Sequence, residues 1–438
     1  MNRTVKSIKK QLKMSISQVT DTPESYVRSP GKDFSRTRKL TMKKMIESVL
    51  VMGGSDLKCE LMDFFKFSPD TPSNAAFVKR RGLISSKAFE HIFNSFTNAC
   101  SQLKLYKGYR LLAVDGSDLH VPTNKEEPNN FYPGVNGLKS YSLLHLNAMY
   151  DLLQNVYIDA VIQESKKQNE HAAFVKMIDR YDCSVPSIFI ADRGFESYNN
   201  IAHVQESGNY YLIRIKNGKK GFSAGLDLPA SDEFDCFFSC DLTKKKTAET
   251  IAAGQKFISH SVNFDYLPDR CRWHVAVKPY HMEFRIVRFK LSDSISETLI
   301  TNLPADSFPP GILKHLYSLR WGIETSFRSL KYSLALLSFH SKKTENICQE
   351  VFARLTMYNF AELISSLIVI KRFRKSRLLK VNFSAAVHLS RQFFLGNISP
   401  PELVQLLSHY TLPVRPTKSV PRKNIKGKSA VSFIYRIA

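Results

Sequence analysis

Two short segments of the chain place an aspartate directly after an apolar run and before a tight, glycine-containing turn. Asp115 follows LLAV and precedes Gly-Ser, and Asp192 follows IFIA and precedes Arg-Gly. In open α/β sheets ligands gather at the carboxyl ends of strands, so neighbouring strands would present both aspartates at one edge. Two carboxylates held together repel, and a divalent cation relieves that repulsion. Aspartate and glycine are also ordinary turn residues, so each motif alone fits a plain turn at least as well.

A third acid lies on a helix predicted over residues 313–334. At about 100° per residue, one stripe of this helix carries a single acid flanked by three cations and a phenol. The stripe consists of Tyr317, Arg320, Glu324, Arg328 and Lys331. A separate apolar stripe is available to pack on a sheet. The pattern suits a metal-binding carboxylate beside a phosphate backbone, but a solvated helix face with i,i+4 ion pairs has the same pattern.

Together the three motifs carry a resemblance to a known family. The sequence resembles the DDE transposases of bacterial insertion sequences, and specifically the insertion sequence four family, whose signature is Y-x2-R-x3-E-x6-K. The signature is complete here as Tyr317, Arg320, Glu324 and Lys331. The first acid of the family stands in Asp-Gly-Ser/Thr and the second in Asp-Arg-Gly-aromatic, which residues 115–117 and 192–195 match in order. The resemblance runs from about Phe34 to the C-terminus.

The resemblance implies a fold and a reaction. The fold is α/β: a ribonuclease H-like catalytic core interrupted by an inserted antiparallel β unit, with a helical N-terminal domain and a helical, basic C-terminal region. The reaction is cut-and-paste transposition of the protein's own insertion sequence through end nicking, hairpin formation and opening, and strand transfer. The implied partners are DNA, both the terminal inverted repeats and the target, and a second copy of the chain in a synaptic homodimer.

The resemblance also assigns residues to roles. The catalytic acids, which would hold two Mg²⁺ or Mn²⁺ ions in each active site, are Asp115, Asp192 and Glu324. Oxygen ligands suit these ions and not zinc. The residues expected to contact DNA near the cut are Tyr317, Arg320, Lys331, Arg193 and Arg328.

The elements that must position these residues follow from the apolar runs. Strands are predicted at 111–114, 143–149, 156–162, 188–191 and 210–215, and helices at 168–181 and 198–205, with Ser197 capping the second. The resulting order is β-β-β-α-β-α-β. Between the second and third acids, alternating segments such as 271–278 and 284–291 suit antiparallel strands.

The segments on either side of the predicted strands have helical spacing. Helices are predicted at 39–51, 56–65, 85–103, 349–370 and 400–409, and residues 79–82 are interpreted as a basic turn of a DNA-binding unit. A simple helical cap remains an alternative for the N-terminal part. The predicted units are 1–108 (DNA-binding), 109–215 (core, first part), 216–305 (inserted β unit), 306–370 (core, second part) and 371–438 (DNA-binding or dimerisation).

Charge distribution favours a nucleic-acid partner. The formal net charge of +24 divides into +12 for residues 1–110, −1 for 111–370 and +13 for 371–438. A neutral centre between basic arms is typical of a polyanion-binding enzyme, whereas a role in solubility alone would scatter the charge. A metal-dependent nuclease of the same fold and a non-catalytic basic DNA-binding protein stay open as rivals.

Length and composition exclude other classes. A chain of 438 residues that is 43% hydrophobic is neither disordered nor a small disulfide scaffold, and its seven cysteines show no metal-ligand spacing. The start lacks the apolar run of a secretory signal, and the longest apolar stretch, 360–370, is too short to span a bilayer. We therefore expect no membrane contact and a cytoplasmic, nucleoid-associated bacterial protein.

Overall fold

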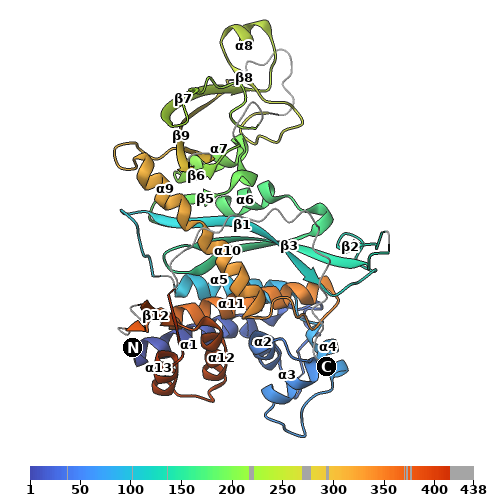
Figure 1. The fold of residues 1–438 in the computed structure, drawn as a ribbon. Coiled ribbons are helices and arrows are strands. Elements are labelled where there is room, and N and C mark those ends of the chain that lie inside the picture. Colours follow the sequence, from blue (N-terminus) through green and yellow to red (C-terminus); the bar gives the residue numbers. More distant parts are fainter. Residues whose placement is uncertain are drawn as a thin grey trace.

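The computed structural model describes residues 1–414 except 37, 101, 136, 217–220, 269–277, 293–294, 369, 371–372 and 375–376. It is a mixed α/β fold in which helices cover a large mixed sheet (Figure 1). The sheet runs β2-β3-β1-β5-β6-β10-β9-β7-β8, and β4 also pairs with β3. Its strands are β1 (Arg110–Val121), β2 (Phe131–Tyr132), β3 (Tyr141–Asp151), β4 (Val156–Glu164), β5 (Ser187–Ala191), β6 (Tyr210–Arg214), β7 (Phe234–Thr243), β8 (Lys256–Phe257), β9 (Tyr280–Ser292) and β10 (Ile295–Thr301).

The centre of this sheet contains the five predicted strands. β1, β3 and β4 pair antiparallel, whereas β5 and β6 run parallel to β1. Every residue of β5 is buried, as expected for a parallel strand covered on both faces. The two predicted helices are α6 (Glu170–Asp179) and α7 (Tyr198–Glu206). Ser197 stands at the N-cap position of α7, but its side chain accepts no capping hydrogen bond, so that part of the prediction is wrong.

A helical layer covers one face of the sheet centre. It shares one apolar core with residues of β1, β3 and β4, and α11 runs buried through its middle (Figure 1). The sequence did not predict α1, α4 or α12. The layer comprises α1 (Asn2–Asp21), α2 (Met42–Val51), α3 (Leu57–Phe64), α4 (Asn74–Arg81), α5 (Ser86–Ala99), α11 (Thr344–Ser365), α12 (Phe383–Leu395) and α13 (Pro400–His409). Beside it lies a small sheet of β11 (Phe373–Arg374), β12 (Arg377–Val381) and β13 (Thr411–Pro413).

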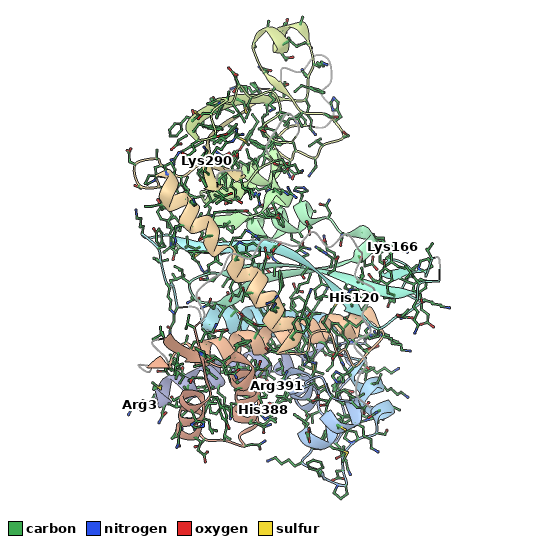
Figure 2. The ribbon with its side chains drawn as sticks, viewed as in Figure 1. Arg3, His120, Lys166, Lys290, His388 and Arg391 are labelled. Carbon is green, nitrogen blue, oxygen red and sulfur yellow. The ribbon has the colours of Figure 1, made fainter. Side chains whose placement is uncertain are left out.

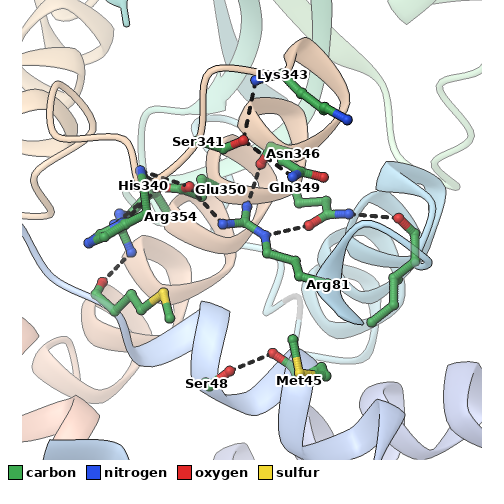
Figure 3. Close-up of polar contacts among 12 residues, drawn as sticks. Met45, Ser48, Arg81, His340, Ser341, Lys343, Asn346, Gln349, Glu350 and Arg354 are labelled. Carbon is green, nitrogen blue, oxygen red and sulfur yellow. Dashed lines mark hydrogen bonds and ion pairs between the residues drawn. The ribbon is translucent and has the colours of Figure 1, made fainter. Parts of the chain in front are cut away.

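The predicted basic turn at residues 79–82 is the end of helix α4, and one of its cations points into the protein. The Arg81 side chain is buried, donates to the Gln349 amide oxygen at 2.7 Å, and pairs with the Glu350 carboxylate at 2.9 Å (Figure 3). His340 also contacts Glu350, at 3.1 Å. Burial opposes the charge of Glu350, but Arg81 and its neighbours lower the pKa of that carboxyl to about 2. Arg81 therefore ties α4 to α11 instead of facing DNA.

The stretch between the second and third acids extends the same sheet. β10 pairs antiparallel with β6, β9 with β10, and β7 with β9, so these strands continue outward from the sheet centre (Figure 1). The short helix α8 (Ala248–Ala252) lies at the far end. The predicted strand at 284–291 falls within β9, whereas nearly all of the one predicted at 271–278 lies outside the described residues.

No described helix is both long enough and apolar enough to cross a membrane. Within the described residues the cysteines are free thiols, at Cys59, Cys100, Cys183, Cys236, Cys240 and Cys348.

Candidate active site

The two aspartates lie next to each other at one edge of the sheet. β1 and β5 pair in parallel from Arg110 opposite Ser187 to Val114 opposite Ala191. The next residue on each strand is therefore an aspartate, Asp115 on β1 and Asp192 after β5. The apolar residues before both aspartates are buried, as the sequence predicted. Asp192 follows the last residue of β5, but Asp115 lies in the middle of β1, which continues to Val121 in pairing with β3, so the predicted tight turn after Asp115 is wrong.

A glycine amide holds each aspartate in place. The Gly116 amide donates to Asp115 Oδ1 at 2.9 Å, and the Gly194 amide donates to Asp192 Oδ1 at 2.7 Å. Asp192 thereby caps a single 3₁₀ turn over Arg193–Phe195. The strand conformation at Gly116 and the 3₁₀ turn at Gly194 thus orient the two carboxylates.

The third acid reaches this edge through Arg320. The guanidinium contacts Glu324 Oε1 at 2.6 Å and Asp115 Oδ2 at 3.5 Å, so it links the helix to β1. The helix predicted over residues 313–334 is in fact two, α9 (Pro310–Leu319) and α10 (Trp321–Tyr332). Around their junction at Arg320, backbone amides bond to carbonyls three residues back, which tightens the turn.

The three acids are close enough for their charges to influence one another. Burial is the main cause that raises the pKa of Asp115 to about 6; the carboxylates of Asp192 and Glu324 add to this, and Arg320 opposes it. Burial, together with Glu297 and Asp192, also raises the pKa of the Tyr317 phenol to about 12. An additional positive charge at this edge would relieve the repulsion among the acids.

The fit to a divalent cation is good in donor chemistry but incomplete in arrangement. Three carboxylates supply only oxygen ligands, as Mg²⁺ and Mn²⁺ prefer. Among the described residues, however, no group of three or more His, Cys, Asp or Glu is arranged to hold a metal ion. The Arg320 guanidinium instead contacts two of the acids. A cation shared by Asp115 and Glu324 requires that Arg320 move.

The five expected DNA contacts divide into two groups. Arg193 and Arg328 are exposed to solvent. Tyr317 and Arg320 are each only 6% exposed, and half-buried Lys331 donates to Ser117 Oγ at 2.7 Å and to the Asp118 carbonyl at 2.9 Å. In the protein alone, Arg320 and Lys331 bond to residues of the site, whereas Tyr317 is buried in an apolar cluster.

Other basic side chains lie elsewhere on the surface. Figure 2 labels exposed Arg3 in the helical layer, His120 and Lys166 towards the β2 end of the sheet, and Lys290 beside α9. The positive charge of the described residues is therefore spread over several sides of the molecule.

One polar cluster beside the site was given no role from the sequence. His145 on β3 is 4% exposed and lies between two carboxylates, with Nδ1 2.8 Å from Asp118 Oδ1 and Nε2 2.9 Å from Glu170 Oε1. Burial opposes its charge, but these two acids raise the pKa of His145 to about 9. A histidine within an apolar strand was visible in the sequence. The strand register that sets it opposite Asp118 was not.

Comparison with known proteins places the chain in a family. Residues 106–360, more than half of the chain and a range that includes all three acids, match the family model of the transposase DDE domain. The chain belongs to the transposase DDE domain family. The match to the DDE domain begins just before β1 and ends within α11.

Individual relatives are distant. The DDE-domain chain is 20% identical over 297 residues to the transposase for insertion sequence element IS231E of Bacillus thuringiensis subsp. finitimus, covering 58% of each chain. It is 22% identical over 350 residues to the transposase for insertion sequence element IS1151 of Clostridium perfringens, covering 72% of this chain and 70% of the relative. The chain thus spans little more than half of the first relative's length.

One solved structure with a similar fold is a piggyBac transposase synaptic complex with hairpin DNA. The likeness covers 96% of this chain and 85% of that chain, at 13% identity and a TM-score of 0.44. A likeness at this TM-score supports no argument about this chain.

Proposed function

We propose that this protein is a DNA transposase that excises its own insertion sequence and joins it to target DNA by metal-assisted phosphoryl transfer. Membership of the transposase DDE domain family supports the reaction class. The single observation that carries the proposal is the parallel pairing of β1 with β5, which brings Asp115 and Asp192 to one edge. Glu324 joins them through Arg320.

In this proposal Asp115, Asp192 and Glu324 are the catalytic acids and hold two Mg²⁺ or Mn²⁺ ions. When bound, the ions activate the attacking water or 3′-hydroxyl and stabilise the leaving oxygen. Arg320 leaves its two carboxylates, which frees their oxygens, and its planar guanidinium turns to a backbone phosphate. The positive charge of Arg320 thus neutralises the acids in the DNA-free protein and a DNA phosphate in the complex.

The other proposed DNA contacts surround this point. Arg193 follows the second acid directly and Arg328 lies one turn after the third, so both exposed cations can meet phosphates on either side of the cut. Tyr317 and Lys331 contact the DNA strand that occupies the site. The same residues position the DNA through nicking, hairpin formation and opening, and strand transfer.

The proposed architecture is a ribonuclease H-like core within the insertion sequence four family. The order β4-β3-β1-β5-β6, with three antiparallel strands followed by two that are parallel to β1, supports this assignment. The proposed units are 1–108, 109–215, 216–305, 306–370 and 371–438. Two copies are needed to process both ends of one element, so the working form is a homodimer on terminal inverted repeats and target DNA.

A strand-joining assay tests the proposal. Wild-type protein is incubated with Mg²⁺, labelled DNA carrying the inverted repeats that flank its gene, and a target plasmid. Excised ends joined to the plasmid are expected. A metal-dependent nuclease would cut without joining, and a non-catalytic basic protein would bind without cutting. Either result would overturn the proposal.

A further inference from the structure

Helix α12 carries an arginine, Arg391, whose charge lies inside the helical layer (Figure 2). Its Nε and Nη2 atoms are both buried, and neither has a hydrogen-bond partner in the part of the chain that the structure describes. Three other buried arginines pair with a carboxylate: Arg81 with Glu350, Arg110 with Asp151 and Arg285 with Asp235. Arg391 departs from this pattern, and a buried charge without a partner destabilises a fold.

The surroundings of Arg391 add positive charge. Arg354 on α11 lies near enough for its charge to act on Arg391, and it is itself 3.8 Å from Glu350 Oε2. Glu350 is already engaged by the ion pair with α4 described above. Burial and the charge of Arg354 lower the pKa of Arg391 to about 9, and Glu60 opposes this. Arg391 therefore keeps its charge at neutral pH, where an anion beside it would be favoured.

The acid that acts on Arg391 does not take up its free nitrogens. Glu60 lies on α3, and its Oε1 accepts from the Ser55 amide at 2.9 Å. Neither Nε nor Nη2 of Arg391 bonds to it. The two donors are therefore left for a group from outside the described chain.

The chemistry of the two donors selects an oxyanion. Nε and Nη2 lie on one edge of the planar guanidinium, so their N–H bonds point in parallel and can meet two oxygens of one phosphate or carboxylate. Arg391 as a whole is half-buried, so this edge lies near the surface of the helical layer. Residues 371–438, which include Arg391, carry a net charge of +13, and this favours phosphate over the less charged carboxylate.

We propose that the Nε–Nη2 edge of Arg391 is a phosphate-binding site in the helical layer. It holds the phosphate through two parallel hydrogen bonds, and Arg354 adds positive charge from α11. The phosphate is either a free inorganic ion or one backbone phosphate of DNA, and the two sources give different results in the experiment. The site uses none of the three acids at the sheet edge, so it does not rest on the proposed function.

The first arm of the experiment is isothermal titration calorimetry of the full-length protein with inorganic phosphate, at pH 7 and constant ionic strength. A site for the free ion predicts that wild type binds phosphate and that Arg391→Met loses this binding. Arg391→Lys keeps the charge but has no parallel pair of donors, so it should bind at least about tenfold more weakly. The matched control is Arg3→Met, which removes an exposed arginine from the same layer and should bind phosphate like wild type.

The second arm is binding of a short DNA duplex at several salt concentrations. A site for a DNA phosphate predicts that Arg391→Met reduces the slope of log binding constant against log salt concentration by about one unit. A site for the free ion leaves this slope unchanged and shows only the calorimetric loss. An Arg391→Met variant that equals wild type in both arms would overturn the proposal. Arg391→Lys that equals wild type in the arm affected by Arg391→Met would show that charge alone suffices, which would also overturn it.

The melting temperature gives an independent check on the unpaired charge. Because Arg391→Met removes a buried charge that has no partner, it should melt no lower than wild type in phosphate-free buffer. A clearly lower melting temperature would show that the guanidinium is stabilised within the protein itself, and the proposal would fail.

Discussion

The buried ion pair between Arg81 and Glu350 should contribute strongly to the stability of the chain. It joins α4 to α11 across 269 residues of sequence, and both side chains are almost fully buried. The fall of the Glu350 pKa from 4.5 to about 2 corresponds to roughly 3 kcal/mol of stabilisation. Arg81 is the largest favourable contributor, and His340 and Arg354 supply the rest. We expect Arg81→Met to lower the free energy of unfolding by about 2–3 kcal/mol at pH 7, because the buried carboxylate loses its strongest partner and keeps only His340 and Arg354.

Urea unfolding at two pH values is the assay, with Lys79→Met as the control. Lys79 is exposed on the same turn of α4, so its replacement removes an equal charge without breaking a buried pair. Since the folded pKa of Glu350 is depressed, the stabilisation is present above about pH 4.5 and is lost as the pH falls towards 2. The difference in the free energy of unfolding between Arg81→Met and wild type should therefore be smaller at pH 3 than at pH 7. A loss below about 1 kcal/mol at pH 7, or an equal gap at both pH values, would refute the reasoning.

Three further predictions concern the site and its surroundings. Gly116→Ala should reduce DNA cleavage at least tenfold, because its methyl group would lie 2.4 Å from a carboxylate oxygen, whereas Gly311→Ala, with open space around it, should cleave normally. Lys331→Ala should reduce the slope of log binding constant against log salt concentration for DNA-end binding by about one unit, as for one lost phosphate contact. An unchanged slope would show that Lys331 bonds only to β1 and does not contact DNA. Burial raises the pKa of Glu362 to about 7, so the folded state loses stability as the pH rises through 7. In urea unfolding, Glu362→Gln should therefore be more stable than wild type by roughly 3 kcal/mol at pH 8 and little changed at pH 5; equal stability at pH 8 would contradict this.

The sheet centre could be predicted from sequence because local pattern decides it. The run before Asp192 forms β5, whose burial on both faces requires an uninterrupted apolar strand. Helix α1 was missed although Val5, Leu12 and Ile16 recur at helical spacing, because the lysines between them were interpreted as part of a basic arm. Similarly, Arg81 looked like a surface cation, since its partner Glu350 lies far away in sequence. Local pattern identifies elements but not the partners that bury a charge.

The candidate site shows the same division. The pairing of Arg320 with Glu324 follows from their i,i+4 spacing. The contact of Arg320 with Asp115 does not, because it depends on how α10 packs against β1. The pairing of Glu170 with His145 depends on the placement of α6 beside β3, and only the folded chain reveals it.

Iron-directed cleavage of the polypeptide tests most directly whether Asp115, Asp192 and Glu324 share one divalent-cation site. Fe²⁺ replaces Mg²⁺, and ascorbate with peroxide then cuts the backbone near the bound ion. The account predicts cuts close to all three residues in wild type, suppression of all cuts by excess Mg²⁺, and loss of all cuts in Asp115→Asn. Cuts near only one acid, or an unchanged pattern in Asp115→Asn, would contradict it.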